Sequence, residues 1–370
     1  MDKLKILIVS ASFYPQNSPR SFRTTELAKE LARQGNSVTV ITPKNPEIHN
    51  IFEKDYGLVI KDMGRLKWKR IIIKGSGINL LFRRFVFRSL VLLFEYPAIE
   101  LFWMVKKILK NESGYDLLIS IAVPFPVHWG VAASRTGYHP IAKTWVADCG
   151  DPYMGDTTDS FRKLFYFKYV EKWFCRKADF ITVPFEGARS AYYPEFHKKI
   201  RTIPQGFQLS ELNLPEYRKI FDYPVFAYAG GFIHEKRDPR AMLRFLSTCN
   251  RSFKFVVYTS QADMLLPFKR DLNDKLDIRD YIPREELLII LSGMDFLINF
   301  DNNTLTQLPS KLIDYLIAGR PILNINSGTD FSGLLEFMNG NYSRKMSLEP
   351  INNYDIKEVA EKFTHLNVNL

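Results

Sequence analysis

The chain has 370 residues, of which 46% are hydrophobic and 25% charged; this suffices for two globular domains and excludes a largely disordered protein. Three widely spaced cysteines, Cys149, Cys175 and Cys249, indicate a reducing compartment, and their spacing suggests no zinc site. The formal charge of +11 is uneven, because residues 1–205 carry 32 Lys and Arg against 19 Asp and Glu, whereas residues 206–370 carry 19 against 21.

Short β-branched runs alternate with helical patterns along the first half of the chain, as in βαβ units with a parallel sheet. A helix is expected at 21–35, and strands at 4–10, 37–42, 115–122, 144–148, 178–184 and 199–206. Residues 117–134 are almost long enough to span a membrane, but Pro124, Pro126 and His128 divide them into a strand, a turn and a helix start. The first residues enter a strand without a secretory signal, so we expect a cytoplasmic protein.

The second half repeats the alternation. Strands are expected at 224–231, 253–260, 295–300 and 320–326. The predicted fold is α/β, with two doubly wound Rossmann-like domains at 1–205 and 223–350 facing a central cleft. A polar, proline-bearing linker covers 206–222, and 351–370 form a helix that packs back on the first domain. Ligands of such sheets bind at the rim where the strands end and the helices begin.

Three predicted helices begin with cations, although the helix macrodipole disfavours a cation there by about 0.3–1 kcal/mol. The cations and their neighbouring caps are Lys236, Arg237 and Arg240 around Asp238–Pro239, Lys311 beside Ser310, and Arg20 and Arg23 around Ser18 or Ser21. For any single helix, long side chains that simply extend into water explain the pattern equally well. Three cases on ligand-binding rims favour a bound anion, and a phosphate would pair with both the cations and the free N–H groups.

Gly230 and Gly231 follow an expected strand, where they let the backbone approach a ligand, although a tight connection is the simpler reading. The chain contains neither a GxxxxGK[ST] nor a GxGxxG stretch. This argues against a P-loop ATPase and a dinucleotide-binding dehydrogenase.

These segments resemble retaining glycosyltransferase family 4, whose members have the GT-B fold of two facing Rossmann-like domains. The resemblance covers most of the chain and is carried by residues 5–42, by "KIRTIPQGFQ" at 199–208, by "YAGGFIHEKRDP" at 228–239 and by "LPSKLIDYLIAGRPIL" at 308–323. It implies an enzyme that moves a sugar from a nucleotide-diphosphate donor held by the second domain to an acceptor held by the first.

The resemblance implies roles for the donor-site residues. Lys236 would contact the donor diphosphate, the backbone near Ser310 would help to hold it, and Asp314 would bind the nucleotide ribose. Thr306 stands where the family's first acidic residue is expected, so the acidic motif is weakened. Gly231 replaces an arginine that is common in the family, which could leave Arg237 to supply that charge.

The stretch "TWVADCGDPYMGD" resembles a family segment after the fourth strand, interrupted here by Cys149 and Gly150. We therefore take Asp148 and Asp151 as candidate catalytic residues, the alternative being that they cap a loop. His128 follows the third rim strand and is a further catalytic candidate, although a lone histidine there more often packs or caps.

Transfer from a nucleotide donor leaves negative charge on the departing diphosphate, which must be stabilised. The chain has no Asp-x-Asp motif to hold a divalent ion. We expect Lys236, Arg237 and the two helix starts to act instead, without metal or cofactor. Retention of the anomeric configuration is implied only by the family.

Residues 65–110 hold eleven Lys and Arg and two Glu, interleaved with aromatic residues. Arg84, Arg88 and Glu95 are expected on one helical stripe, and Arg83, Arg84 and Arg88 are expected to meet an anionic membrane. A buried helix with a charged outer edge is the alternative. Because the resembled family binds its acceptor in this half, a lipid-linked acceptor is expected, and no motif for nucleic acid accompanies the charge.

The favoured function is a glycosyltransferase of surface-glycan assembly, acting as a peripheral protein on the inner face of the plasma membrane. A nucleotide-sugar epimerase of the same fold is one alternative, although such an enzyme needs no membrane surface. A catalytically inactive protein that binds a nucleotide sugar or glycolipid is another, suggested by Thr306.

Overall fold

The computed structural model describes residues 3–68, 77–156, 162–235, 237–300, 311–326, 330–348 and 350–367. Its internal contacts divide the chain into two compact units. Unit 1 comprises Met1–Gln208 and Asn352–Leu370, and unit 2 comprises Leu209–Ile351. The boundary lies inside the expected linker, where the only regular element among the described residues 206–222 is a short 3-10 turn at Leu209–Glu211.

Unit 1 is built on a seven-stranded parallel sheet in the order β3-β2-β1-β4-β5-β6-β7. The strands are β1 (Lys5–Ser10), β2 (Ser37–Thr42), β3 (Val59–Asp62), β4 (Tyr115–Ala122), β5 (Ala142–Cys149), β6 (Phe180–Val183) and β7 (Ile200–Thr202). Central strands such as β1 and β4 are buried on both faces, which explains their continuous apolar runs.

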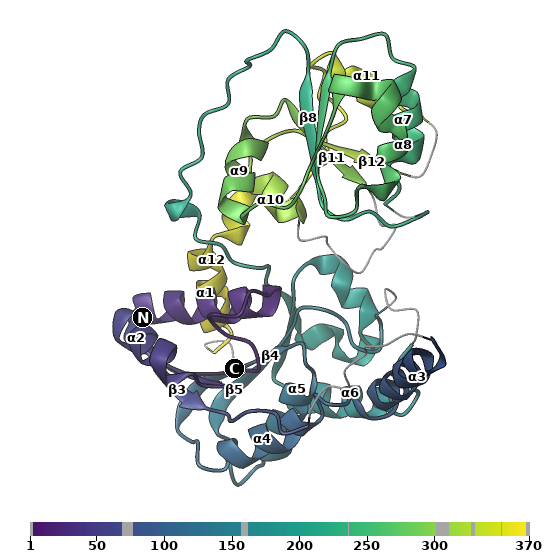
Figure 1. The fold of residues 1–370 in the computed structure, drawn as a ribbon. Coiled ribbons are helices and arrows are strands. Elements are labelled where there is room, and N and C mark those ends of the chain that lie inside the picture. The colour runs from purple at the N-terminus through teal and green to yellow at the C-terminus, as the bar shows by residue number, and fades with distance from the viewer. Residues whose placement is uncertain are drawn as a thin grey trace. The chain divides into compact units, whose positions relative to one another are not determined.

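Helices cover both faces of this sheet (Figure 1). One face carries α1 (Pro19–Arg33), α2 (Pro46–Tyr56) and α12 (Ile356–His365), and the other carries α4 (Glu100–Leu109), α5 (Pro126–Ser134) and α6 (Phe167–Lys177). Helix α3 (Gly77–Phe94) lies at the outer edge, near α6. Two short 3-10 helices, Glu186–Ala191 and Pro194–Lys199, precede β7. Val359 and Phe363 of α12 are fully buried against the core that contains Leu27 and Leu31 of α1.

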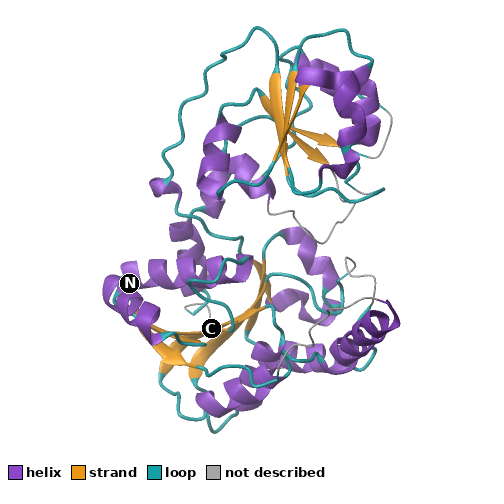
Figure 2. Ribbon diagram, viewed as in Figure 1, coloured by secondary structure: helices purple, strands orange, loops and turns teal. Residues whose placement is uncertain are grey.

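Unit 2 has a five-stranded parallel sheet in the order β10-β9-β8-β11-β12, drawn in orange in Figure 2. The strands are β8 (Val225–Ala229), β9 (Lys254–Tyr258), β10 (Leu276–Arg279), β11 (Phe296–Phe300) and β12 (Ile322–Ile325). One face packs on α7 (Arg240–Ser247), α8 (Leu266–Leu272) and α11 (Ser332–Met338), and the other on α9 (Arg284–Ser292) and α10 (Lys311–Ile317). Short 3-10 helices occur at Ala262–Met264 and Asn273–Lys275, and a further one, Ile351–Tyr354, spans the boundary at which the chain returns to unit 1.

The two doubly wound sheets confirm the predicted fold class. All ten predicted strands form, whereas β3 and β10 were not predicted. Residues 117–134 become the end of β4, a turn and α5, as expected. Among the described residues, we find no helix with the length and hydropathy that crossing a membrane requires.

Candidate active site

In unit 2, the central strand β8 ends in a glycine pair beside a buried tyrosine. Gly230 has a φ of +143°, which L side chains rarely adopt, so glycine is needed there. At Gly231 a Cβ would lie 3.1 Å from Gln261 Oε1, which accepts a hydrogen bond from Phe232 N at 2.8 Å. Tyr228 OH donates to the carbonyl oxygen of Gly231 at 2.8 Å. Gly230 N also donates to the carbonyl oxygen of Tyr258 at 3.0 Å, so hydrogen bonds hold the turn after β8 in place.

Two of the predicted donor-site cations gather at this tyrosine. Lys311, the first residue of α10, places Nζ 4.4 Å from the centre of the Tyr228 ring. Burial raises the pKa of Tyr228 above its usual range, and the nearby charge of Arg237 opposes that rise. Arg237 Nε is buried and has no hydrogen-bond partner among the described residues. Because a buried donor without a partner costs roughly 1–3 kcal/mol, an anion at this turn would supply a missing acceptor.

Arg240, the third cation near this helix start, is neutralised within the chain. Helix α7 begins at Arg240, one residue later than predicted, with Pro239 at the N-cap position. Asp238 still caps the backbone, because its Oδ1 accepts from Arg240 N at 3.0 Å, and its Oδ2 lies 2.5 Å from Arg240 Nη2. The hydrogen bonds from the Arg240 side chain lower the pKa of Asp238 to about 2. The expected conflict of charge at this position is thus resolved without a ligand.

Asp314, predicted to bind a ribose, is engaged by a side chain that sequence reasoning missed. Arg284 of α9 places Nη2 2.6 Å and Nε 2.8 Å from Asp314 Oδ1. Burial raises the pKa of Asp314, and the charge of Arg284 opposes the rise. The Asp314 side chain is 23% exposed. Arg284 lies on a different helix, so no local pattern could have indicated this pair. The predictions for Lys236, Thr306 and Ser310 fall outside the described residues.

In unit 1, Arg23 and Asp148 form a closed ion pair. The Nη2 and Nε of Arg23 lie 2.8 and 3.0 Å from the Asp148 carboxylate, to which Thr182 Oγ1 also donates at 2.7 Å. The side chains of Arg23 and Asp148 are only 5% and 2% exposed. Arg23 further donates to the carbonyl oxygens of Ile203 and Pro204. Burial alone would raise the pKa of Asp148, but the charge of Arg23 outweighs it and the pKa is lowered.

This pair corrects two predictions. Sequence reasoning placed an external anion beside Arg23 and proposed Asp148 as a catalytic residue. The anion of Arg23 is Asp148 itself, which has little surface left for a substrate. The positive charge in the second turn of α1 therefore serves the fold of unit 1.

Arg20 and Asp151 form the more accessible pair at this rim. Helix α1 begins with Ser18 as N-cap, whose Oγ accepts from Ser21 N at 3.2 Å. Arg20 Nη2 lies 3.0 Å from Asp151 Oδ2, and the Asp151 side chain is 46% exposed. A Cβ at Gly150 would lie 1.5 Å from Arg20 Nη1, so the guanidinium occupies the space that any side chain there would fill. Gly150, which interrupts the family-like segment, thus leaves the space that the Arg20 guanidinium fills.

His128 is fully buried, and the structure favours the packing alternative over a catalytic role. Its Nδ1 lies 2.8 Å from Ser120 Oγ, which also accepts a hydrogen bond from Trp145 Nε1, and its Nε2 lies 3.4 Å from Cys149 Sγ. Burial lowers the pKa of His128 to about 3. The ring is therefore neutral near neutral pH and bonded inside the core, where no substrate proton can reach it.

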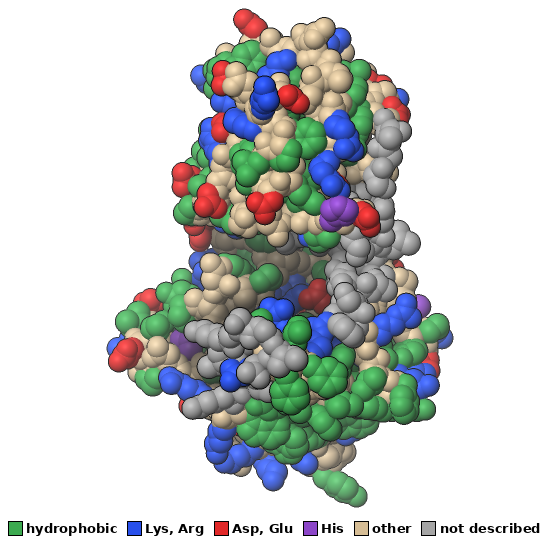
Figure 3. Space-filling model, turned by 45° about the vertical axis from the view of Figure 1, so that its right-hand side comes forward, with side chains coloured by type: hydrophobic (Ala, Val, Ile, Leu, Met, Phe, Trp, Pro, Cys, Tyr) green, Lys and Arg blue, Asp and Glu red, His purple; other side chains and the backbone are tan. Residues whose placement is uncertain are grey.

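The three membrane-surface candidates lie on α3. None of the described side chains of this helix, residues 80–94, is buried. Arg83 and Arg84 are exposed and Arg88 is half-buried. Large apolar side chains of α3 are also exposed, namely Leu81, Phe82, Phe85, Leu93 and Phe94. Figure 3 shows hydrophobic side chains gathered on one face of unit 1, with Lys and Arg at its edges. The alternative of a buried helix is therefore wrong.

Glu95, however, does not lie on the helical stripe of Arg84 and Arg88. The helix ends at Phe94, and Glu95 adopts a φ of +55°. Its carboxylate turns inward, where it accepts a hydrogen bond from Tyr153 OH at 3.1 Å and pairs with Lys163 Nζ. The helical periodicity was extended one residue too far.

Comparison with known proteins places the chain in a family. The model of Glycosyltransferase Family 4 matches residues 22–211, just over half of the chain. A glycosyltransferase from Rickettsia africae ESF-5 is 12% identical with a TM-score of 0.56, covering 100% of this chain and 94% of its own. Alr3699/HepE of Anabaena, solved with UDP-glucose, is 8% identical with a TM-score of 0.58, covering 99% and 100%.

A third similar structure is the lipopolysaccharide outer core galactosyltransferase WaaB, 11% identical with a TM-score of 0.61 and covering 98% of this chain and 99% of its own. No curated protein matches the chain. Identities this low show a shared fold alone, which is GT-B, and the family rests on the matched segment. The chain is therefore a member of glycosyltransferase family 4, with the GT-B fold and the activity of a glycosyltransferase.

Proposed function

We propose that the chain transfers a sugar from a nucleotide-diphosphate donor to an acceptor carried on a lipid, in the assembly of a surface glycan such as lipopolysaccharide, O-antigen, capsule or exopolysaccharide. The observation that carries the donor half is the meeting of Arg237 and Lys311 at Tyr228, beside the glycine turn at Gly230. Two neighbouring cations are what a diphosphate needs. The UDP-glucose bound to the Anabaena protein supports a nucleotide-sugar donor.

The proposed chemistry follows from the charge of the leaving group. As the bond between sugar and diphosphate breaks, negative charge grows on the phosphate oxygens. Arg237 and Lys311 would stabilise it, each charge-assisted hydrogen bond contributing roughly 1.5–3 kcal/mol. We propose that Lys236 and the backbone near Ser310 join them, so that side-chain cations, rather than a divalent ion, neutralise the diphosphate.

Two further roles belong to this proposal. Asp314 would bind the ribose, sharing its carboxylate with Arg284. Of the three catalytic candidates, Asp148 and His128 are buried and Asp151 is 46% exposed, so Asp151 would act in catalysis, and Arg20 beside it would contact the acceptor. Family membership supports retention of the anomeric configuration.

The acceptor half of the proposal rests on α3. Its exposed cations and aromatic side chains suit a surface that binds anionic lipid headgroups and the upper part of the acyl layer. The protein would thus work as a peripheral protein on the cytoplasmic face of a membrane. Replacing Arg83, Arg84 and Arg88 with glutamine should release it from anionic vesicles; undiminished binding would remove this surface from the proposal.

The donor half is tested by calorimetric titration with UDP-glucose. Arg237→Ala should weaken donor binding roughly tenfold to a hundredfold, the equivalent of one lost charge-assisted bond. Arg244→Ala is the matched control, because Arg244 lies on α7, carries the same charge and is exposed. Equal affinities for the wild type and both variants would contradict the assignment.

A further inference from the structure

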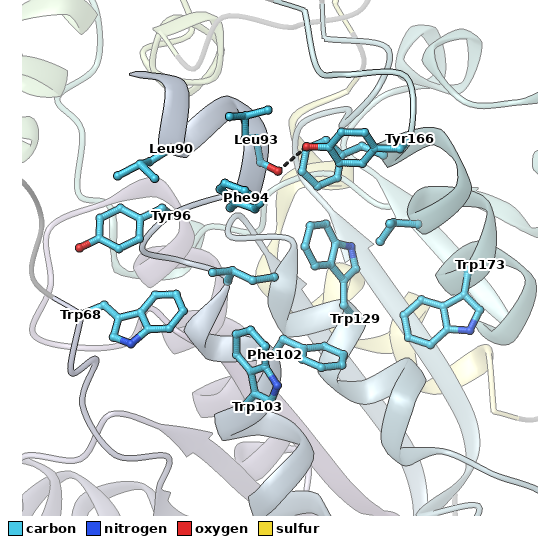
Figure 4. Close-up of a pocket in the computed structure, with 13 residues that line it drawn as sticks. Trp68, Leu90, Leu93, Phe94, Tyr96, Phe102, Trp103, Trp129, Tyr166 and Trp173 are labelled. Atoms are coloured by element: carbon cyan, nitrogen blue, oxygen red, sulfur yellow. Dashed lines mark hydrogen bonds between the residues drawn. The ribbon is translucent and has the colours of Figure 1, made fainter. Parts of the chain in front are cut away.

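A large apolar pocket lies in unit 1, between the end of α3 and helices α4, α5 and α6 (Figure 4). Its volume is about 920 Å³, at the upper end of the range of roughly 300–1,000 Å³ typical of small-molecule sites. Four of the chain's five tryptophans line it: Trp68, Trp103, Trp129 and Trp173. A cavity with such walls offers water few hydrogen bonds, whereas a hydrocarbon would gain by entering it.

The pocket opens to the apolar surface of α3. Leu93 and Phe94 are among its lining residues and are 42% and 58% exposed, while Trp68 and Trp103 are 44% and 51% exposed. On the other side, Trp129 is only 3% exposed and forms the inner part of the wall. The end of α3 is fixed there by a hydrogen bond from Tyr166 OH to the carbonyl oxygen of Leu93. A chain could therefore pass from the exposed face into the interior.

Near the mouth of this pocket, cations are exposed and carboxylates are not. The two carboxylates of residues 65–110 both point inward: Glu95 bonds Tyr153, and Glu100 accepts from the backbone N–H groups of Lys67 and Trp68 at 2.8–3.0 Å. On α3, Arg83 is exposed and stands seven residues before the lining residue Leu90, so the two lie on the same face of the helix, whereas Arg84 and Arg88 lie on other faces. At about 1.5 Å per residue, Arg83 lies roughly 10 Å along the helix axis from Leu90.

We propose that this pocket holds the isoprenoid chain of a polyprenyl-phosphate-type acceptor. The inference rests on the proposed function and names the acceptor class. A single pocket suits a lipid with one chain, and a cation about two helical turns from the mouth, on the same face of α3, suits a phosphate joined directly to that chain. The chain in the pocket and the phosphate at Arg83 would hold the acceptor sugar at a fixed height above the membrane.

The test uses the full-length protein and soluble prenyl diphosphates, with tryptophan fluorescence and calorimetry as readouts. Geranylgeranyl diphosphate should bind at least about tenfold more tightly than geranyl diphosphate, because the longer chain buries more hydrocarbon. It should also change the fluorescence, since four of five tryptophans line the pocket. No dependence on chain length, or equal binding of inorganic pyrophosphate, would overturn the proposal. Equal binding of unbranched octadecyl diphosphate would show a general acyl site and overturn the isoprenoid assignment.

Two variants connect the effect to the pocket. Val170→Phe fills it and Leu90→Asn makes its wall polar without changing charge; both residues line it and are half-buried. Each should remove the chain-length dependence. The matched control is Phe85→Asn, which lies on exposed α3 outside the lining and should weaken vesicle binding while preserving that dependence. If Val170→Phe and Leu90→Asn unfold at the wild-type temperature and retain the dependence, the pocket is not the site.

Binding of UDP, GDP, CMP and dTDP sugars is measured on the same samples to separate this inference from the proposed function. Prenyl binding without any donor binding or transfer would leave the pocket standing and remove the proposed function. Donor binding and sugar release without prenyl binding would support the donor half of the proposed function and overturn the assignment of the pocket. In either case the Arg237 variant reports on unit 2 alone.

Discussion

Replacing Asp148 with alanine should strongly destabilise unit 1, because it leaves the Arg23 guanidinium buried without its carboxylate. The two side chains are 5% and 2% exposed and share two hydrogen bonds of 2.8 and 3.0 Å. Removing one partner of a buried pair typically costs roughly 3–5 kcal/mol. For a unit of this size, each kcal/mol corresponds to about 2–4 °C, so the midpoint of thermal unfolding should fall by roughly 6–20 °C.

The assay is thermal unfolding followed by circular dichroism, with the double variant Asp148→Leu, Arg23→Met as the control. Removing both charges should restore most of the stability, since a buried ion pair contributes little over well-packed apolar residues. The lowered pKa of Asp148 sets the pH dependence: the pair stabilises the fold above the unfolded pKa, near about pH 4, and this contribution is lost as the pH falls through the folded value. A midpoint shift of less than about 2 °C for Asp148→Ala would refute the closed pair.

Three other predictions concern separate features. Glu171 is fully buried, and burial raises its pKa from 4.5 to about 7, so its contribution to the free energy of unfolding falls as the pH rises from about 4.5 to 7. Glu171→Gln should therefore stabilise the protein by about 3 kcal/mol at about pH 8 and little at pH 4. Equal effects of the substitution on urea unfolding at the two pH values would contradict this. Gly150→Ala should displace the Arg20 guanidinium and lower the free energy of unfolding by about 1 kcal/mol or less. In a protein that already carries Arg20→Ala, the same substitution should have no further effect, and an undiminished effect would show that Gly150 does not act through Arg20. A chelator should leave the rate of sugar transfer unchanged, and loss of transfer that is restored by a divalent ion would contradict charge neutralisation by side chains alone.

The sequence predicted the parts of the fold that depend on central strands. Strands such as β1 and β4 are buried on both faces and read as apolar runs bounded by turns. The two missed strands, β3 with the sequence VIKD and β10 with LDIR, are each four residues long and lie at the edges of their sheets. An edge strand packs on fewer neighbours, so charged residues are tolerated and the apolar run is lost.

At the candidate site, local patterns found residues and misjudged their partners. Arg23 and Arg240 are cations near a helix start, as predicted, but their charges are neutralised by ion pairs with Asp148 and Asp238 of the same chain. Asp148 is 125 residues from Arg23 in sequence, so only the sheet order β1-β4-β5 brings them together. The contact of Tyr228 with both Arg237 and Lys311 was not predicted, because in the sequence this tyrosine is one of several apolar residues of a strand.

The most direct test of a nucleotide-sugar-dependent glycosyltransferase is a thermal-shift screen of the wild type and Arg237→Ala with UDP, GDP, CMP and dTDP sugars. A donor at a hundred times its dissociation constant stabilises the native state by about 2.7 kcal/mol, which for unit 2 corresponds to roughly 5–11 °C. One class of donor should shift the wild type by that amount and Arg237→Ala by clearly less. No shift with any donor, or the same shift in both proteins, would contradict donor binding at the turn after β8.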